Sequence, residues 1–81
     1  MSSRAYALLD VVPGELTNVQ ARLFLLPETV SVDVFSSMDG LVASLAAPGP
    51  EELRRLMGRR LRLLDGVLRV TELNVITFHH L

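Results

Sequence analysis

The feature that most constrains this sequence is a pattern that occurs in both of its halves. An apolar segment ends at Pro13-Gly14 and an amphipathic segment follows, and later Pro48-Gly49 again separates an apolar segment from an amphipathic one. Each amphipathic segment stops at a helix-terminating signal, Leu26-Pro27 in the first half and Asp65-Gly66 in the second. The pattern predicts the order strand, helix, strand, strand, helix, strand.

Four segments have the residue patterns of strands. The first, from Arg4 to Val12, is almost continuously apolar and short for a helix. In the second, from Val30 to Phe35, valines alternate with polar residues, so all of these valines are expected to point one way. The third, from Leu41 to Ala46, is apolar at nearly every position and needs cover on both faces. The fourth is expected to run from Val67 to Phe78.

A polar stretch joins the second strand to the third and makes them a hairpin. Its residues are Ser36, Ser37, Met38, Asp39 and Gly40. An Asp-Gly pair is favoured in tight hairpins because it tolerates the positive φ angles of such turns. The turn chemistry by itself accounts for these residues. The alternative is that Ser36, Ser37 and Asp39 also contact an ammonium or carboxylate group of a ligand.

Two stretches carry apolar residues at helical spacing, which predicts two amphipathic helices. Their apolar residues are Leu16, Val19, Leu23 and Leu26 in the first and Leu53, Leu56, Met57, Leu61 and Leu64 in the second. Pro50, Glu51 and Glu52 are typical of a helix start. Gly58 indicates a close packing contact in the middle of the second helix. Acidic residues offset the arginines of this helix, so we expect a solvated face rather than a phosphate site.

The predicted order corresponds to an α+β fold of the ferredoxin-like βαββαβ type. Right-handed crossovers place both helices on one face of a four-stranded antiparallel sheet. The other face is left uncovered, although the first and third strands carry apolar residues on both sides. Soluble monomers rarely expose a large contiguous apolar surface. We therefore expect the domain to dimerise through its open sheet face.

Composition also favours self-association. The chain has 81 residues, 49% of them hydrophobic, and no cysteine. It corresponds to a single domain, residues 1–81, whose small core gains nothing from disulfides or thiolate metal sites. Burial between subunits is then the remaining common source of stability for so small a domain. A homo-oligomer is expected.

Charge and hydropathy argue against several classes of partner. The net charge is −1, and no uncompensated basic surface of the kind that binds nucleic acid is evident. No apolar run approaches the roughly 18 residues of a membrane span. The first residues lack the features of a signal peptide. We expect a cytoplasmic protein that binds neither nucleic acid nor membrane.

With these segments in place, the chain resembles the effector-binding (RAM) domain of the Lrp/AsnC family of transcription regulators, an ACT-like module. The family's opening strand and Pro-Gly match Ala5 to Gly14. Its helix stop and second strand, commonly Ile-Pro-x-Val-x-x-Val-Tyr, match Leu26 to Phe35. Its Pro-Gly-Val is similar to Asp65-Gly66-Val67, and its Thr-Glu is similar to Thr71-Glu72. The resemblance covers Arg4 to Ile76 and leaves out the DNA-binding domain of full-length members.

The resemblance implies a regulatory module that dimerises through its sheets, assembles into rings of dimers and binds an amino acid or similar small effector between dimers. Its implied partners are a full-length regulator or an enzyme. In the family, the turn between the second and third strands contacts the effector. The implied effector site comprises Ser36, Ser37, Met38, Asp39 and Gly40, with Thr71 and Glu72 of the last strand.

The sequence departs from the family pattern at two places in this site. The family's Gly-x-Tyr-Asp falls on Ser37 to Gly40, so the glycine, the aromatic residue and the acid are displaced. Leu73 stands where the family has the second threonine of Thr-Glu-Thr. These departures favour an alternative function, an oligomerisation or protein-interaction module that keeps the fold without an effector.

A third alternative is a cofactor-independent enzyme of the dimeric α+β barrel type. It would use Tyr6, Asp10 and Asp33 in a pocket between the sheet and the helices, an argument from fold analogy alone. The sequence has no Gly-x-Ser-x-Gly motif, no cysteine nucleophile and no phosphate-binding loop. We expect that the protein is not an enzyme and that it binds no cofactor.

Two pairs of polar residues near the end of the chain remain. His79 and His80 do not predict a metal site, because adjacent residues on a strand point to opposite faces. Glu72 and Asn74 share a face of the last strand. They are expected either to line an interface cavity or to be simply exposed.

Overall fold

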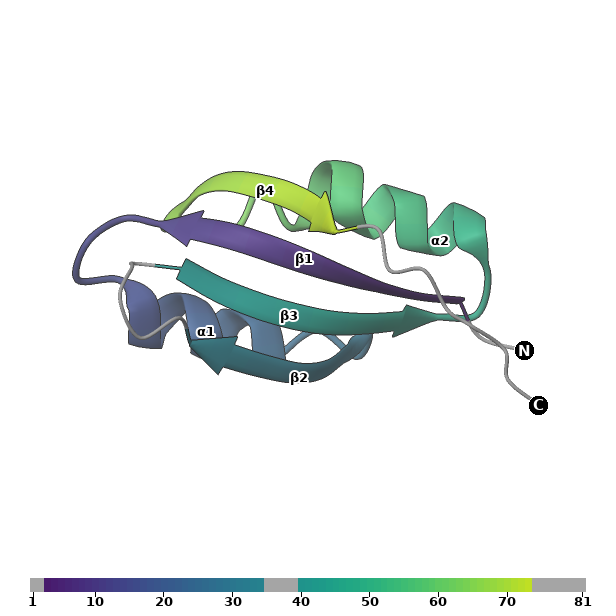
Figure 1. Cartoon of the computed structure of the whole chain (residues 1–81), viewed down its shortest axis with the longest axis horizontal. Coiled ribbons are helices and arrows are strands. Elements are labelled where there is room, and N and C mark those ends of the chain that lie inside the picture. The colour runs from purple at the N-terminus through teal and green to yellow at the C-terminus, as the bar shows by residue number, and fades with distance from the viewer. Residues whose placement is uncertain (1–2, 35–39, 74–81) are drawn as a thin grey trace.

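The computed structural model describes residues 3–34 and 40–73, and its elements follow the predicted order. They are β1 (Ser3–Val11), α1 (Leu16–Phe24), β2 (Thr29–Val34), β3 (Gly40–Ala47), α2 (Pro50–Arg55), the π-helical turn η1 (Leu56–Arg60) and β4 (Val67–Leu73). The strands form one antiparallel sheet in the order β2-β3-β1-β4 (Figure 1). The predicted ferredoxin-like fold is confirmed.

One face of the sheet carries the hydrophobic core. Every second residue of β1, from Ala5 to Val11, is buried, and the residues between them point the other way. The same alternation on β3 buries Leu41, Ala43 and Leu45. These side chains form a single core with Val19 and Leu23 of α1 and with Leu56, Met57 and Leu61. Both helical segments therefore cover the same face of the sheet.

The two outer strands each contain one residue that interrupts the pairing register. On β2, the register shifts between Thr29 and Ser31, so Val30 is an extra residue opposite β3. Val32 and Val34 share the helix face, as expected, because they pair with Ala43 and Leu41. The bulge interrupts the expected alternation at Val30. On β4, the corresponding extra residue is Leu68. Phe35 and residues 74–78, the expected ends of these strands, lie outside the described residues.

Hydrogen bonds join the first helix to the first residue of β2 and to the segment before β4. The hydroxyl of Thr29 donates to the carbonyl of Leu23 at 2.6 Å, and the guanidinium of Arg22 donates to the carbonyl of Asp65 at 2.9 Å. Gly66 follows with φ of 91°, and a Cβ there would lie 2.7 Å from Cγ2 of Val19. A close glycine packing contact thus lies directly before β4, at Gly66.

The second helical segment is not a continuous α-helix. At Leu56 it passes into a π-helical turn, in which the N–H of Leu61 donates to the carbonyl of Leu56 at 3.0 Å. The wider turn lets the neighbouring residues Leu56 and Met57 both reach the core. The close contact predicted at Gly58 is wrong. Gly58 is exposed, and a Cβ there would meet no atom within 4 Å.

Candidate functional site

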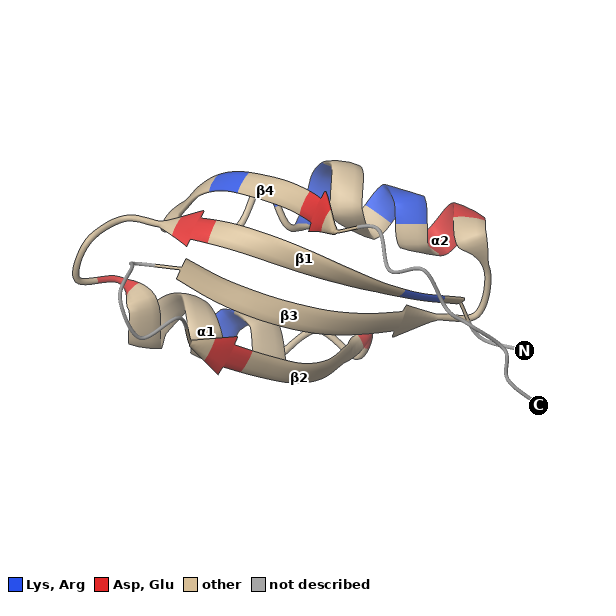
Figure 2. Cartoon of the chain, viewed as in Figure 1, with Lys and Arg blue, Asp and Glu red and all other residues tan. Residues whose placement is uncertain are grey.

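The face of the sheet opposite the helices is called the open face below. Strand register places twelve side chains on it: Ser31 and Asp33 of β2; Val42, Ser44 and Ala46 of β3; Arg4, Tyr6, Leu8 and Asp10 of β1; and Arg69, Thr71 and Leu73 of β4. None of the described helices or loops covers it. β3, in the middle of the sheet, carries no charged residue (Figure 2).

The open face has an apolar centre built from two rows of paired residues. In one row Ser44 and Tyr6 are neighbours, with Leu73 beyond Tyr6 on β4. In the next row Val42 pairs with Leu8. Tyr6 is 40% exposed and Leu73 36% exposed, whereas Ser44 between the strands is buried. The centre of this face therefore presents aromatic and aliphatic side chains to the surroundings.

A third row makes one end of the open face polar. Gly40 pairs with Asp10, and Asp10 pairs with Arg69 on the other side. Oδ2 of Asp10 lies 3.6 Å from Nε of Arg69. Because Arg69 is largely exposed, this ion pair contributes little to stability and its groups remain accessible. β3 begins at this end of the sheet, with Gly40.

Three of the predicted effector-site residues lie within the described part of the chain, and the strand register keeps them apart. Gly40 is the first residue of β3, at the polar end. Thr71 pairs with Leu8 on the open face, one row away from Arg69 and on the far side of β1 from Gly40. Ser36, Ser37, Met38 and Asp39 lie outside the described residues.

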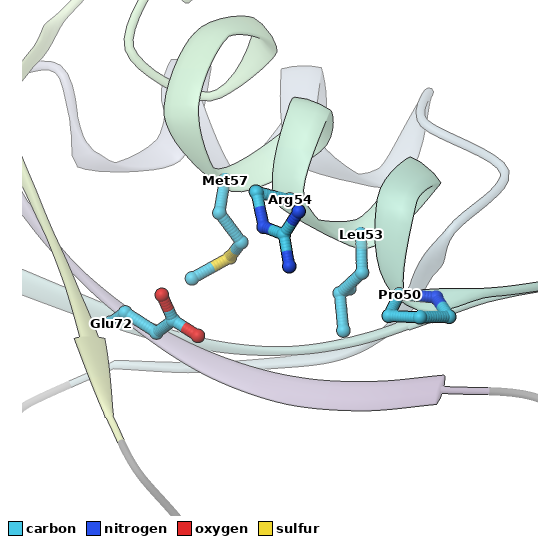
Figure 3. A pocket seen from close by; sticks show the side chains of 5 residues that line it. All are labelled: Pro50, Leu53, Arg54, Met57 and Glu72. Carbon is cyan, nitrogen blue, oxygen red and sulfur yellow. The ribbon is translucent and has the colours of Figure 1, made fainter.

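The side chains of Thr71 and Glu72 lie on opposite faces of the sheet. It pairs with Ala7, whose side chain is buried on the helix face. Glu72 therefore points towards α2, where it lines a hollow of about 180 Å³ with Pro50, Leu53, Arg54 and Met57 (Figure 3). Sequence reasoning did not identify this hollow. The alternation of β4 places Glu72 opposite Thr71, but the position of α2 above it depends on tertiary packing. Asn74 lies outside the described residues.

The residues suggested for catalysis do not form the pocket proposed for them. Tyr6, Asp10 and Asp33 all lie on the open face, so they point away from the helices. The proposed pocket between the sheet and the helices is wrong for these three residues.

The described residues can also be searched for a metal site and for a membrane-spanning helix. No group of three or more histidine, cysteine or acidic residues that could hold a metal ion occurs among residues 3–34 and 40–73. His79 and His80 lie outside this part of the chain. None of the described helices is long and apolar enough to cross a membrane.

Comparison with known proteins gives matches at the level of structure. No family model matches the chain, and no curated protein matches it. The crystal structure of TTHA0845 from Thermus thermophilus is similar with a TM-score of 0.82 and 21% identity over 99% of both chains. The regulatory protein PF0864 from Pyrococcus furiosus, a member of the AsnC family, has a TM-score of 0.71 and 17% identity. That match covers 86% of this chain and 48% of PF0864.

The same fold also occurs in a protein of a different functional class. The Escherichia coli Tat proofreading chaperone NapD has a TM-score of 0.80 and 14% identity over 95% of this chain and 80% of NapD. An ACT domain shares the fold as well. The chain thus has the fold of AsnC-family regulators and ACT domains, as its resemblance to the RAM domain implies. Because NapD has it too, the fold alone does not decide the function.

Proposed function

We propose that this chain is a small regulatory domain that self-associates through the open face and binds an amino acid or similar small effector where dimers meet. The observation that carries the first part is the apolar centre of the open face, where Tyr6, Leu8 and Val42 lie on neighbouring strands. Burying such a surface against a second copy removes apolar area from water and gives a face-to-face packing of two sheets. The resulting assembly has the helices on its outer surfaces.

The second part of the proposal concerns the polar end of the open face. Gly40, the first residue of β3, lies beside the Asp10–Arg69 ion pair. An α-amino acid has one cationic and one anionic group, and this end offers one carboxylate and one guanidinium that are both accessible. Thr71 adds a hydroxyl one row away. In AsnC-type regulators, the matching turn contacts the effector, which supports the same location here.

The experiment measures oligomer size and melting temperature of the full chain with and without a panel of amino acids. Gel filtration coupled to light scattering should give a dimer or larger assembly. At least one amino acid should raise the melting temperature or change the assembly size, because a ligand that binds the native state stabilises it by mass action. A monomer at micromolar concentration would contradict the self-association, and an assembly that ignores every amino acid would contradict the sensing.

A specific observation favours a second function, an association module without an effector. Leu73 lies on the open face beside Tyr6, at the position where the resembling family has a threonine. It extends the apolar centre and removes a polar contact to a ligand. This module would form the same oligomer and serve a regulator or enzyme partner. An intact assembly that shows no response to any amino acid would support it.

A further inference from the structure

We propose that the groove between β4 and the helical segment α2–η1 binds an extended peptide of another protein. The peptide would pair with β4 as a fifth strand and place one basic side chain against Glu72. This groove lies on the helix side of the sheet, whereas the proposed effector site lies on the open face. A result that contradicts one of these two sites therefore does not contradict the other.

The first observation is the exposed edge of β4. β4 is the last strand of the sheet, and β1 is its only partner among the described strands. Such an edge presents backbone N–H and C=O groups that can pair with another chain. Peptide-binding domains use this arrangement, in which backbone hydrogen bonds give affinity and pockets for alternate side chains give specificity.

The second observation is the size and position of the hollows along that edge. The hollow of about 180 Å³ at Pro50 and Leu53 lies next to a separate one of about 130 Å³ at Gly58 and Val70. Both share Arg54, Met57 and Glu72. Pockets for whole small molecules usually measure about 300–1,000 Å³. Each hollow is smaller than that and suits a single side chain.

The third observation is the shape of the walls. Leu53 and Met57 project from the helical segment towards the sheet, and Glu72 reaches from β4 towards Met57 (Figure 3). On β1 the residue paired with Glu72 is the small Ala7. A Cβ atom placed on Gly58 would have no atom of the surrounding structure within 4 Å. A long aliphatic stem therefore has two apolar walls to pack on, with its charged head at the open rim.

The fourth observation is charge. The guanidinium of Arg54 forms an exposed ion pair with Glu51 at 2.7 Å, which offsets part of its charge. Glu72 forms no ion pair with any of the described residues. It is thus the carboxylate that a ligand in the first hollow would meet. Arg62 lines only the second hollow and disfavours a second cation there. These charges select a peptide with a single basic residue rather than a polybasic one.

The test uses the full chain and a short fluorescent peptide of alternating threonine and valine with arginine at its centre. A matched peptide carries norleucine, which keeps the aliphatic stem and removes the charge. Fluorescence anisotropy gives both affinities for the wild type, for Glu72→Gln and for Glu52→Gln. Glu52 is an exposed carboxylate of α2 that does not line the groove, so its variant is the control. Hydrogen exchange locates the bound peptide on the sheet.

The arginine peptide should bind the wild type more tightly than the norleucine peptide. Glu72→Gln should weaken binding of the arginine peptide about fivefold, the upper range for a partly exposed ion pair, and leave the norleucine peptide unaffected. Among residues 68–73, the alternate amide protons that do not point towards β1 should gain protection from exchange. The proposal would be overturned if neither peptide bound, or if Glu72→Gln bound the arginine peptide as tightly as the wild type does. It would also be overturned if the peptide protected β2 instead of β4, or if free arginine competed as well as the arginine peptide. A change of assembly size in Glu72→Gln would do so too, because the groove would then hold a second copy of the chain.

Discussion

Arg60 of η1 donates a hydrogen bond to Glu28, with 2.8 Å between Nη1 and Oε2, although the two residues are 32 positions apart. Glu28 lies directly before β2, and its own carbonyl accepts a hydrogen bond from the N–H of Ala46 in β3. Its other carboxylate oxygen is buried without a hydrogen-bond partner among the described residues. This ion pair therefore joins the π-helical turn to the β2 side of the sheet.

Replacing Arg60 by alanine should lower the free energy of unfolding by about 1 to 2 kcal/mol, because a mostly buried carboxylate loses its partner. The matched variant is Arg54→Ala. Arg54 pairs with Glu51 at a similar distance, but both side chains are more than half exposed, so its loss should cost about 0.5 kcal/mol or less. Urea denaturation measures both. Equal losses would show that the contact between Arg60 and Glu28 adds nothing beyond a surface pair.

Two glycines of the second half should respond to alanine in opposite ways. Gly66→Ala should destabilise the domain by about 1 kcal/mol or more, because Gly66 has positive φ and its Cβ would collide with Val19. Gly58→Ala should stabilise it by about 0.5 to 1 kcal/mol, since the site is open and alanine favours helical structure. Thermal unfolding followed by circular dichroism compares them. A stable Gly66→Ala variant would contradict the packing seen at α1.

The order of elements and the core could be predicted from the sequence because both depend on local periodicity. Alternating and helical spacing identified the strands and helices, and Leu9, Leu23 and Leu45 are buried. The π-helical turn could not be predicted in this way. It depends on a backbone hydrogen bond from Leu61 to Leu56, which no side-chain pattern encodes. The close packing contact that the sequence predicts at Gly58 occurs instead at Gly66, because contacts of this kind depend on tertiary packing.

The candidate site was predicted less completely than the fold. The family motif places Thr71 and Glu72 in one predicted effector site. In the structure Thr71 pairs with Leu8 and Glu72 pairs with Ala7, so their side chains lie on opposite faces of the sheet. Gly40 and Arg69 come together only through β1, which pairs with both of their strands. Such neighbours are far apart in sequence. They follow from strand order, so sequence patterns alone do not reveal them.

The open face yields a prediction about assembly. Leu8→Lys places a charge at its apolar centre, beside Val42 and Thr71, and should convert the oligomer to monomer because burying an unpaired ammonium group is costly. Light scattering after gel filtration measures the molar mass. Leu63→Lys is the control, since Leu63 is largely exposed outside the open face and should leave the mass unchanged. An unchanged mass for Leu8→Lys, with the fold intact by circular dichroism, would place the interface elsewhere.

The polar end of the open face yields a prediction about the effector. Thr71→Val keeps the shape of the side chain and removes the hydroxyl, so it should weaken the response to an effective amino acid about fivefold without changing the assembly. Leu73→Thr should act in the opposite direction, because it adds a hydroxyl on the same face as Thr71. Melting temperature as a function of amino-acid concentration measures both effects. A response that is identical in the wild type, Thr71→Val and Leu73→Thr would mean that the effector does not touch β4. The site would then be confined to Gly40 and its row neighbours Asp10 and Arg69.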